Sequence, residues 1–350
     1  MSGGMAGSQH GVSPSASNYP GLAADDPNTI LAATEAIGAR IVQVRASIAR
    51  VMFGQDEVID DTLITLLSGG HVLLVGVPGL GKSRLVETLG VVLGMATKRI
   101  QFTPDLMPAD IVGSEVLDET EGRRAFRFVP GPVFCQLLMA DEINRASPRT
   151  QSALLQAMQE QRVAIGGVEH VLPRPFHVLA TQNPIEQEGT YPLPEAQLDR
   201  FLLEINVTYP NRDAERAMLL ATTGAHEARP IQAMTAEDLL FAQALVRRLP
   251  IGEKVVEAIL SLVRGCRPET ASDDVVRRHV SWGPGPRAAQ ALMLASRARA
   301  LLQGRLSPSV DDIAALARPV LRHRMALSFS ARADGIALTD VIDRLVGTIG

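Results

Sequence analysis

Short, nearly continuous apolar runs alternate with helical patterns in the first part of the chain. Five such runs occur, namely HVLLVG (71–76), TKRIQF (97–102), CQLLMAD (135–141), FHVLATQ (176–182) and FLLEINV (201–207). Strands of this composition are expected in a parallel sheet that is covered on both faces. Helix starts lie between them, at Ser147 followed by Pro148 and at Pro194. The alternation predicts a doubly wound α/β domain with a five-stranded parallel sheet over residues 29–208.

The alternation of strand and helix patterns is absent before residue 29 and after residue 208. Residues 1–28 are rich in Gly, Ser, Ala and Pro without periodicity, which predicts a disordered tail. Asn28 is then the expected cap of a helix over residues 30–52, which Gly54 ends. After residue 209 helical patterns follow one another, with expected starts at Thr235 and at Ser307-Pro308. We therefore predict a second, all-helical domain over residues 209–350, with helices near 213–224, 235–249, 253–266, 286–304, 307–324 and 338–349.

Composition excludes several classes of protein. The 350 residues carry a net charge of −4 and only 4% aromatic residues, so neither nucleic-acid binding nor a base-stacking surface is expected. The chain has no run of about 18 apolar residues, which predicts no membrane insertion. Two cysteines, Cys135 and Cys266, are too few for a disulfide framework, and we expect a reduced, cytoplasmic setting.

The segment GVPGLGKS, between the first strand and a helical pattern, matches G-x-x-x-x-G-K-[ST]. Glycines let backbone N–H groups turn inward on phosphates, and the helix N-terminus adds a favourable dipole. Lys82 is expected to reach the β- and γ-phosphates of ATP, and the Ser83 hydroxyl to ligate Mg²⁺. The predicted nucleotide-binding residues of this loop are Gly76, Val77, Pro78, Gly79, Leu80, Gly81, Lys82, Ser83 and Arg84.

Polar side chains follow two further strands. Asp141 and Glu142 end the run LLMADE, where an acid can orient Mg²⁺ and its neighbour can act as general base toward water. Asn183 follows the fourth strand and can hold that water or sense the γ-phosphate. Taken alone, the acidic pair could cap a loop, and Asn183-Pro184 could be a turn. Their place behind a phosphate loop favours ATP hydrolysis.

The segments GVPGLGKS, LLMADEIN, LATQNP and PLPEAQLDRF together resemble the MoxR family of AAA+ ATPases, over residues 30 to 330. The resemblance implies Walker A roles for Lys82 and Ser83, Walker B roles for Asp141 and Glu142, and a sensor 1 role for Asn183. It also implies a helix-2 insert at about 102–134 and a pre-sensor hairpin at about 160–176, where Gly166-Gly167 is the expected turn.

Further site residues are implied by the same resemblance. Arg200, in LDRF, corresponds to an arginine finger that reaches the ATP of a neighbouring subunit, although it could instead pair with Asp199 or Glu195 on the surface. Arg287, in WGPGPR, falls at sensor 2, a lid arginine that contacts the γ-phosphate; Gly285 stands where the family usually has serine. Gln55 lies in VMFGQDEVI, which resembles the segment that lines the adenine and ribose pocket. Arg145, in DEINRA, is a second candidate for the interface between subunits.

The family's properties imply a homo-oligomer, as a hexameric ring, in which hydrolysis drives the remodelling or maturation of protein complexes. They also imply a partner with a von Willebrand factor A domain. Two alternatives stay open at this point. One is a nucleic-acid remodelling or chelatase-type motor, which the net charge of −4 disfavours. The other is an ATP-gated scaffold without turnover, which the presence of both Glu142 and Asn183 disfavours.

Overall fold

A computed structural model describes residues 27–120, 123–186, 189–224 and 228–349. Its centre is a five-stranded, entirely parallel sheet in the order β2-β5-β8-β1-β9. All five expected strands are confirmed, with slightly shorter bounds: β1 (Val72–Val75), β2 (Thr97–Gln101), β5 (Leu137–Asp141), β8 (His177–Gln182) and β9 (Leu203–Asn206). The predicted disordered tail lies, except for its last two residues, outside the described part of the chain.

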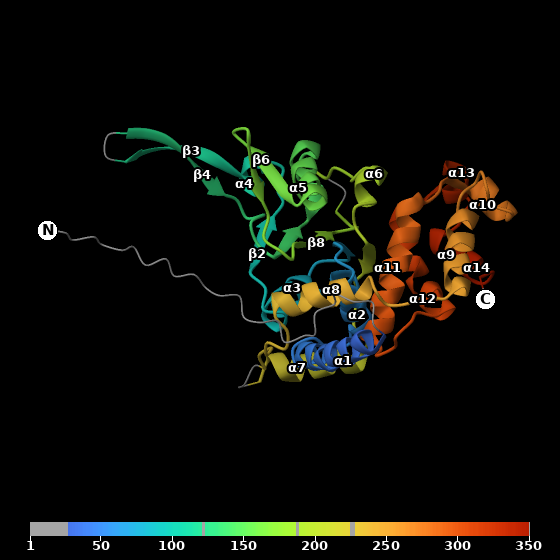
Figure 1. Cartoon of the computed structure of the whole chain (residues 1–350). Helices are drawn as coiled ribbons and strands as arrows, with labels where there is room; N and C mark the ends of the chain where they lie inside the picture. The colour runs from blue at the N-terminus through green and yellow to red at the C-terminus, as the bar shows by residue number, and fades with distance from the viewer. Residues whose placement is uncertain (1–26, 121–122, 187–188, 225–227, 350) are drawn as a thin grey trace.

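Helices cover both faces of this sheet. Successive strand residues point to opposite sides, so each face carries apolar side chains that the helices bury. Val72 and Leu74 of β1 belong to one buried cluster, whereas Leu73 belongs to the other. The first cluster joins the sheet to α1 (Pro27–Ala49), α2 (Asp56–Leu67), α3 (Lys82–Val92) and α8 (Ala236–Val246). The second is covered by α4 (Pro108–Val112) and α5 (Pro148–Glu160). The predicted doubly wound α/β class is confirmed (Figure 1).

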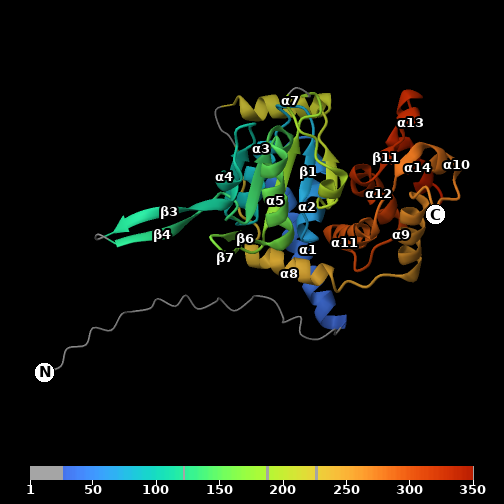
Figure 2. The same ribbon diagram turned by 90° about the horizontal axis from the view of Figure 1, so that it is seen from above.

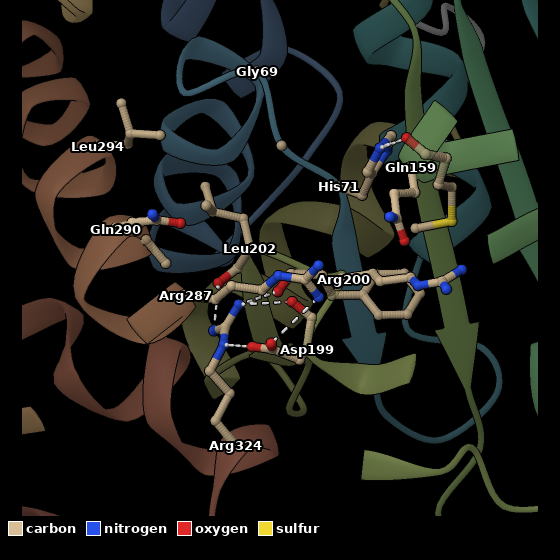
Figure 3. A pocket seen from close by; sticks show the side chains of 14 residues that line it. Gly69, His71, Gln159, Asp199, Arg200, Leu202, Arg287, Gln290, Leu294 and Arg324 are labelled. Carbon is tan, nitrogen blue, oxygen red and sulfur yellow. Dashed lines mark hydrogen bonds and ion pairs between the residues drawn. The ribbon is translucent and has the colours of Figure 1, made fainter. Parts of the chain in front are cut away.

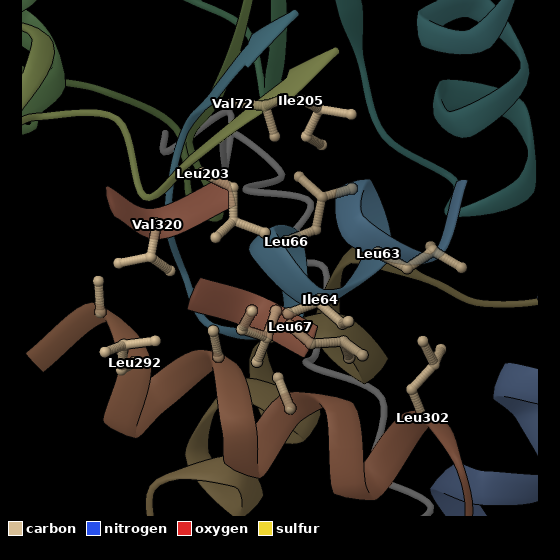
Figure 4. Packing of buried hydrophobic residues seen from close by; sticks show 14 of the residues in the cluster. Leu63, Ile64, Leu66, Leu67, Val72, Leu203, Ile205, Leu292, Leu302 and Val320 are labelled. Carbon is tan, nitrogen blue, oxygen red and sulfur yellow. The ribbon is translucent and has the colours of Figure 1, made fainter. Parts of the chain in front are cut away.

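The C-terminal half is mainly helical, as predicted, and continues the first buried cluster. In Figure 4, α11, which carries Leu292 and Leu302, packs against α2, which carries Ile64 and Leu67. α8, which follows residue 209, packs on α1 and α2, which precede it. The two sides of the predicted domain boundary therefore share one core, and the boundary at residue 209 stays a prediction. The helices are α7 (Arg212–Thr222), α8, α9 (Glu253–Gly265), α10 (Asp274–His279), α11 (Pro286–Leu302), α12 (Val310–Leu321), α13 (Phe329–Ala333) and α14 (Leu338–Val346), with short helices η1 (Ile143–Arg145), α6 (Glu195–Leu198) and η2 (Arg322–Arg324) elsewhere.

Three details of the prediction are wrong. The region after residue 209 is not all-helical, because β10 (Val280–Trp282) pairs antiparallel with β11 (Ala326–Leu327), and segments this short show no readable alternation. α12 is capped by Ser309 rather than Ser307, since Asp312 completes a capping box with Ser309. α1 begins at Pro27 and ends at Ala49, so Asn28 is inside its first turn. The expected cap residues Ser147 and Thr235 are confirmed.

Two β-hairpins stand apart from the sheet, within the predicted inserts. β3 (Gly113–Thr120) and β4 (Arg123–Pro130) form a ribbon that projects from the core, on the side away from the C-terminal helices (Figures 1 and 2). β6 (Arg162–Ile165) and β7 (Val168–Val171) pair through Gly166 and Gly167, both at positive φ, which confirms the predicted turn. The ring of Phe128 stacks on that of His170 at 3.9 Å and joins the two hairpins. None of the described helices is long and apolar enough to span a bilayer.

Two histidines, His71 and His177, are buried beside each other at the start of β1 and β8. His71 accepts the N–H of Val178 at Nδ1 (3.0 Å), and His177 accepts an N–H of Gln243 at Nε2 (3.0 Å). These contacts require neutral rings, because a second ring proton would face another donor. Burial lowers the pKa of His71 to about 3, helped by the charge of His177, and burial lowers that of His177 to about 4.

This pair predicts a loss of stability in mild acid. Below the unfolded-state pKa of 6.5, the unfolded chain binds protons that the folded chain does not, until the folded pKa values are reached. Each histidine then removes about 1.4 kcal/mol of unfolding free energy per pH unit. Asp61, whose pKa burial raises to about 7, has the opposite sign, so the histidine term is best isolated by comparing variants.

The measurement is urea unfolding of the wild type and of His177→Gln between pH 6.5 and 5. The slope of unfolding free energy against pH should be smaller in His177→Gln, by about 0.7 kcal/mol per unit at pH 6.5 and by a difference that approaches about 1.4 kcal/mol per unit at pH 5. Equal slopes in the two proteins would show that His177 takes up its proton as readily in the folded chain as in the unfolded one.

Candidate active site

The phosphate-binding loop leaves β1 at its carboxyl end and enters α3. Gly79 and Gly81 have φ values of 85° and 77°, a region that side chains disfavour, and Gly81 forms the N-cap of α3. Gly76 is needed for another reason, since a Cβ there would lie 2.5 Å from the carbonyl oxygen of Val207 on the neighbouring segment. The glycines thus let the backbone turn N–H groups toward an anion at the helix N-terminus.

Lys82, the first residue of α3, lies along this loop and donates to the carbonyl oxygens of Gly76 and Val77. Burial lowers the pKa of its ammonium group, while the nearby charges of Asp141 and Glu142 act in the opposite direction. A partly desolvated cation held against a glycine-rich loop is well suited to the β- and γ-phosphates of a nucleotide.

The two acids at the end of β5 are held by both neighbouring strands. Asp141 is 9% exposed; its Oδ1 accepts the hydroxyl of Thr181 on β8 (2.5 Å), and its Oδ2 accepts Nη2 of Arg99 on β2 (2.5 Å). Glu142 follows in a left-handed conformation, φ 55°, and its Oε2 accepts Nε2 of Gln101 on β2 at 2.7 Å. The sheet order β2-β5-β8 therefore surrounds the acidic pair with polar groups.

Asn183 and Arg145 complete the rim of this site. Asn183, after β8, accepts the N–H of Ile185 (3.2 Å) and donates to Glu186 (3.4 Å). Arg145 Nη1 contacts Oε2 of Glu142 at 3.0 Å and lies 3.9 Å from Glu186. Arg145, predicted as an interface candidate, is thus bound to the acid of its own chain.

One polar cavity, of about 460 Å³, is bordered by most of the predicted phosphate loop together with Asp141, Glu142 and Asn183. Its lining comprises Pro78, Gly79, Gly81, Lys82, Ser83, Arg84, Arg99, Gln101, Asp141, Glu142, Thr181 and Asn183. The structure therefore gathers at one edge of the sheet residues separated by about one hundred positions in sequence. This edge carries the carboxyl ends of the parallel strands, where such folds bind ligands.

A second cavity, of about 340 Å³ and mainly apolar, adjoins the first and shares Pro78, Gly79, Gly81 and Arg84 with it. Gln55 is 8% exposed, borders this cavity and donates through Nε2 to the carbonyl of Leu80 (3.0 Å). The remaining lining is Val51, Met52, Phe53, Leu80, Tyr209, Pro210, Glu215, Met218, Leu219 and Thr222. An apolar cavity joined to a polar one across a glycine loop matches the two ends of a nucleotide.

The residues present also fit Mg²⁺ bound together with phosphates. Among the described residues, no group of three or more His, Cys, Asp or Glu side chains could hold a metal by itself. Ser83 and Asp141 supply oxygen atoms beside the phosphate loop. Mg²⁺ prefers such a site, with few protein oxygens, several water molecules and the phosphates of a substrate.

Arg200 and Arg287 lie elsewhere. They border another cavity with Asp199 and His71, which precede β9 and β1, and this cavity shares no residue with the phosphate site. It lies at the amino ends of the parallel strands, whereas the phosphate loop lies at their carboxyl ends. The four residues of β1 alone separate the two edges by about 13 Å. The structure therefore does not bring Arg287, the predicted sensor 2, to the phosphate loop of its own chain.

A buried arginine that the sequence analysis did not identify, Arg324, fixes the segment around Asp199 and Arg200 at this second cavity. Arg324 is 2% exposed; its Nε binds Asp199 Oδ1 (2.7 Å), and its Nη2 binds the carbonyl of Phe201 (2.6 Å). Arg287 lies 3.5 Å from the other oxygen of Asp199 (Figure 3). Within the described part of the chain, Arg200 forms an ion pair with neither Asp199 nor Glu195. The pKa of Arg200 is lowered mainly by burial and, to a smaller extent, by the positive charge of Arg287.

Comparison with known proteins agrees with this geometry. Residues 71–203 match the family described as ATPase family associated with various cellular activities (AAA), and residues 273–345 match the AAA lid domain. The chain is 43% identical over 303 residues to Chaperone MoxR1 of Mycobacterium tuberculosis, covering 86% of this chain and 80% of that one. It is 32% identical to Protein MoxR of Paracoccus denitrificans, covering 83% of this chain and 89% of that one. A crystal structure of a candidate ATPase from Cytophaga hutchinsonii superposes with a TM-score of 0.85 at 34% identity, over 92% of this chain and 98% of the other.

Proposed function

Because this chain belongs to the MoxR family of AAA+ ATPases, we propose that it hydrolyses ATP with Mg²⁺ at sites shared by neighbouring copies and thereby remodels partner proteins. The observation that carries the proposal is the division of the site. Phosphate, metal and base residues meet at one edge of the sheet, while Arg200 and Arg287 meet at the opposite edge.

The roles of the residues follow from their chemistry. Lys82 and the loop N–H groups hold the phosphates, and Ser83 with Asp141 holds Mg²⁺, whose charge draws electron density from the phosphate oxygens. Asn183 orients a water molecule, and Glu142 accepts its proton as the oxygen attacks the γ-phosphorus and ADP leaves. Gln101 and Arg145 fix the carboxylate of Glu142 at distances of 2.7 and 3.0 Å.

A neighbouring copy supplies the missing positive charge. Guanidinium groups stabilise the charge of phosphoryl transfer, and the described phosphate cavity contains Arg84 and Arg99 but not Arg200 or Arg287. In a closed head-to-tail ring, the amino-edge face of one copy meets the carboxyl-edge face of the next. We propose that Arg200 and Arg287 act together on the neighbour's ATP in such a ring, which the family resemblance makes hexameric.

The client side of the proposal rests on the two hairpins. Val116, Leu117 and Phe126 on the projecting ribbon are 46%, 52% and 71% exposed, and Val168 and Val171 on the second hairpin are 55% and 69% exposed. β7 leads directly into β8, which carries Thr181 and ends before Asn183. We propose that this connection transmits the conformational change caused by hydrolysis to a protein bound at the hairpins. We further propose that the partner carries a von Willebrand factor A domain and that the protein works in the cytoplasm.

Capture of the client tests this proposal. In the presence of ATP and Mg²⁺, Glu142→Gln should stall with its client bound and retain a protein with a von Willebrand factor A domain, identified by mass spectrometry. The matched control is Lys82→Ala, which should bind little ATP and retain little of the same protein. Equal retention by both variants, or retention independent of ATP, would contradict coupling between the nucleotide and the client.

A further inference from the structure

Thr181 contacts both acids of the site through a single hydroxyl group. Its Oγ1 donates to Oδ1 of Asp141 at 2.5 Å and accepts the backbone N–H of Glu142 at 2.8 Å. The residue is 1% exposed and lies on β8, next to β5, which carries Asp141. A threonine hydroxyl has one proton to donate and lone pairs to accept, so both contacts can form at once.

The two contacts fix the orientation of the Asp141 carboxylate and the backbone conformation of Glu142. The carboxylate of Asp141 can rotate about its side-chain torsions, and the bond from Thr181 selects one orientation, with Oδ2 directed toward Arg99. Glu142 adopts φ 55° and ψ 52°, a left-handed conformation that is uncommon for residues other than glycine. The accepted N–H anchors that conformation and hence the direction in which the Glu142 side chain leaves the backbone.

We propose, on the basis of the ATPase function above, that Thr181 is a positioning residue that aligns Asp141 for Mg²⁺ and Glu142 for the attacking water. Two residues later the same chain segment carries Asn183. The positions of the metal acid, the base and the water-orienting amide are therefore set by β8 and the residue that follows it. Thr181 acts through these residues and needs no contact with the nucleotide.

Thr181→Val tests the inference, because it keeps the shape of the side chain and removes the hydroxyl. Loss of a group that orients a metal ligand typically lowers metal affinity or activity by about 10- to 100-fold. In Thr181→Val we expect a fall of that size in kcat and in the affinity for Mn²⁺ in the presence of ATP, measured by electron paramagnetic resonance. Metal-free binding of a fluorescent ATP analogue should stay near the wild-type value, and Thr181→Ser should restore both losses.

Thr62→Val is the matched control. It removes another fully buried threonine hydroxyl, which donates to the carbonyl of Val58 within α2 at 2.7 Å, and it should leave Mn²⁺ affinity unchanged. If Thr181→Val does not fold, Thr181→Ala removes the same hydroxyl without overfilling the site and is compared with Thr181→Ser in the same way.

The outcomes separate the two proposals. A wild-type protein without ATPase activity would contradict the proposed function itself. Wild-type activity with unchanged kcat and unchanged Mn²⁺ affinity in Thr181→Val would overturn the role of Thr181 alone. Equal loss in Thr181→Val and Thr181→Ser would also overturn it, because the hydroxyl would then not be the group that matters.

Discussion

Replacing Arg200 by alanine is expected to lower the ATPase rate of the assembled protein by about 10³-fold or more. A guanidinium beside the γ-phosphate stabilises charge that develops in the transition state, and we propose that this site receives it from the adjacent copy. Arg200 is well suited to the role, because Arg324 binds the Asp199 carboxylate and the carbonyl of Phe201 on either side of it. In the described residues, moreover, Arg200 Nε is buried without a hydrogen-bond partner.

The measurement is the steady-state ATPase rate at a protein concentration where sedimentation shows assembly. Binding of an ATP analogue at the phosphate loop should be nearly unchanged in Arg200→Ala, since Arg200 lies at the other edge of the sheet. Arg200→Lys keeps the charge but not the planar fork, so it should recover only part of the rate. Full activity of assembled Arg200→Ala would exclude the arginine-finger role.

Glu142→Gln is expected to lower kcat by about 10²- to 10⁴-fold, the usual contribution of a positioned general base. Glutamine has the same shape and can still accept the N–H of Gln101, but it cannot take a proton from water. ATP binding should therefore persist, and a single-turnover experiment should show intact ATP on the enzyme. The Glu142 backbone, held by Thr181, should be unaffected by the change.

Glu186→Gln provides the control for this prediction. Glu186 is a second carboxylate at the same rim, 3.4 Å from Asn183 Nδ2 and 3.9 Å from Arg145. Its replacement should change kcat by less than about threefold, because Glu186 contacts the amide of Asn183 and, unlike Glu142, does not border the phosphate cavity. A Glu142→Gln protein that turns over as fast as the wild type would move the role of base to another residue, with Glu186 the nearest alternative.

Local patterns predicted much of this fold. The central strands β1, β5 and β8 are visible because they are buried on both faces, whereas the edge strands β2 and β9 are more exposed. The phosphate loop is visible because Gly79 and Gly81 must adopt positive φ. Asp141, Glu142 and Asn183 could be found because each lies at or just after the end of a strand. Helix starts were found where a cap and its partner are close in sequence, as at Thr235 and Asp238.

Other parts of the site depend on contacts that sequence order hides. Thr181, Gln101 and Arg99 reach the acids because β8 and β2 flank β5, and the register pairs Gln101 with Asp141. The order of strands in a sheet cannot be read from the strands themselves. Arg324 had no motif to mark it, because its partners lie more than one hundred residues earlier. The motif around Arg287 indicated its class but not the edge of the sheet that it faces.

A mixing experiment tests the shared site most directly. Arg200→Ala keeps Glu142 but lacks the arginine, and Glu142→Gln keeps Arg200 but lacks the base. In rings assembled from equal amounts of both, about one quarter of the interfaces would join an intact Glu142 to an intact Arg200. The mixture should therefore regain roughly a quarter of the wild-type ATPase rate, although each variant alone is nearly inactive. A mixture no more active than the mean of the two separate variants would contradict a site completed by the neighbouring copy.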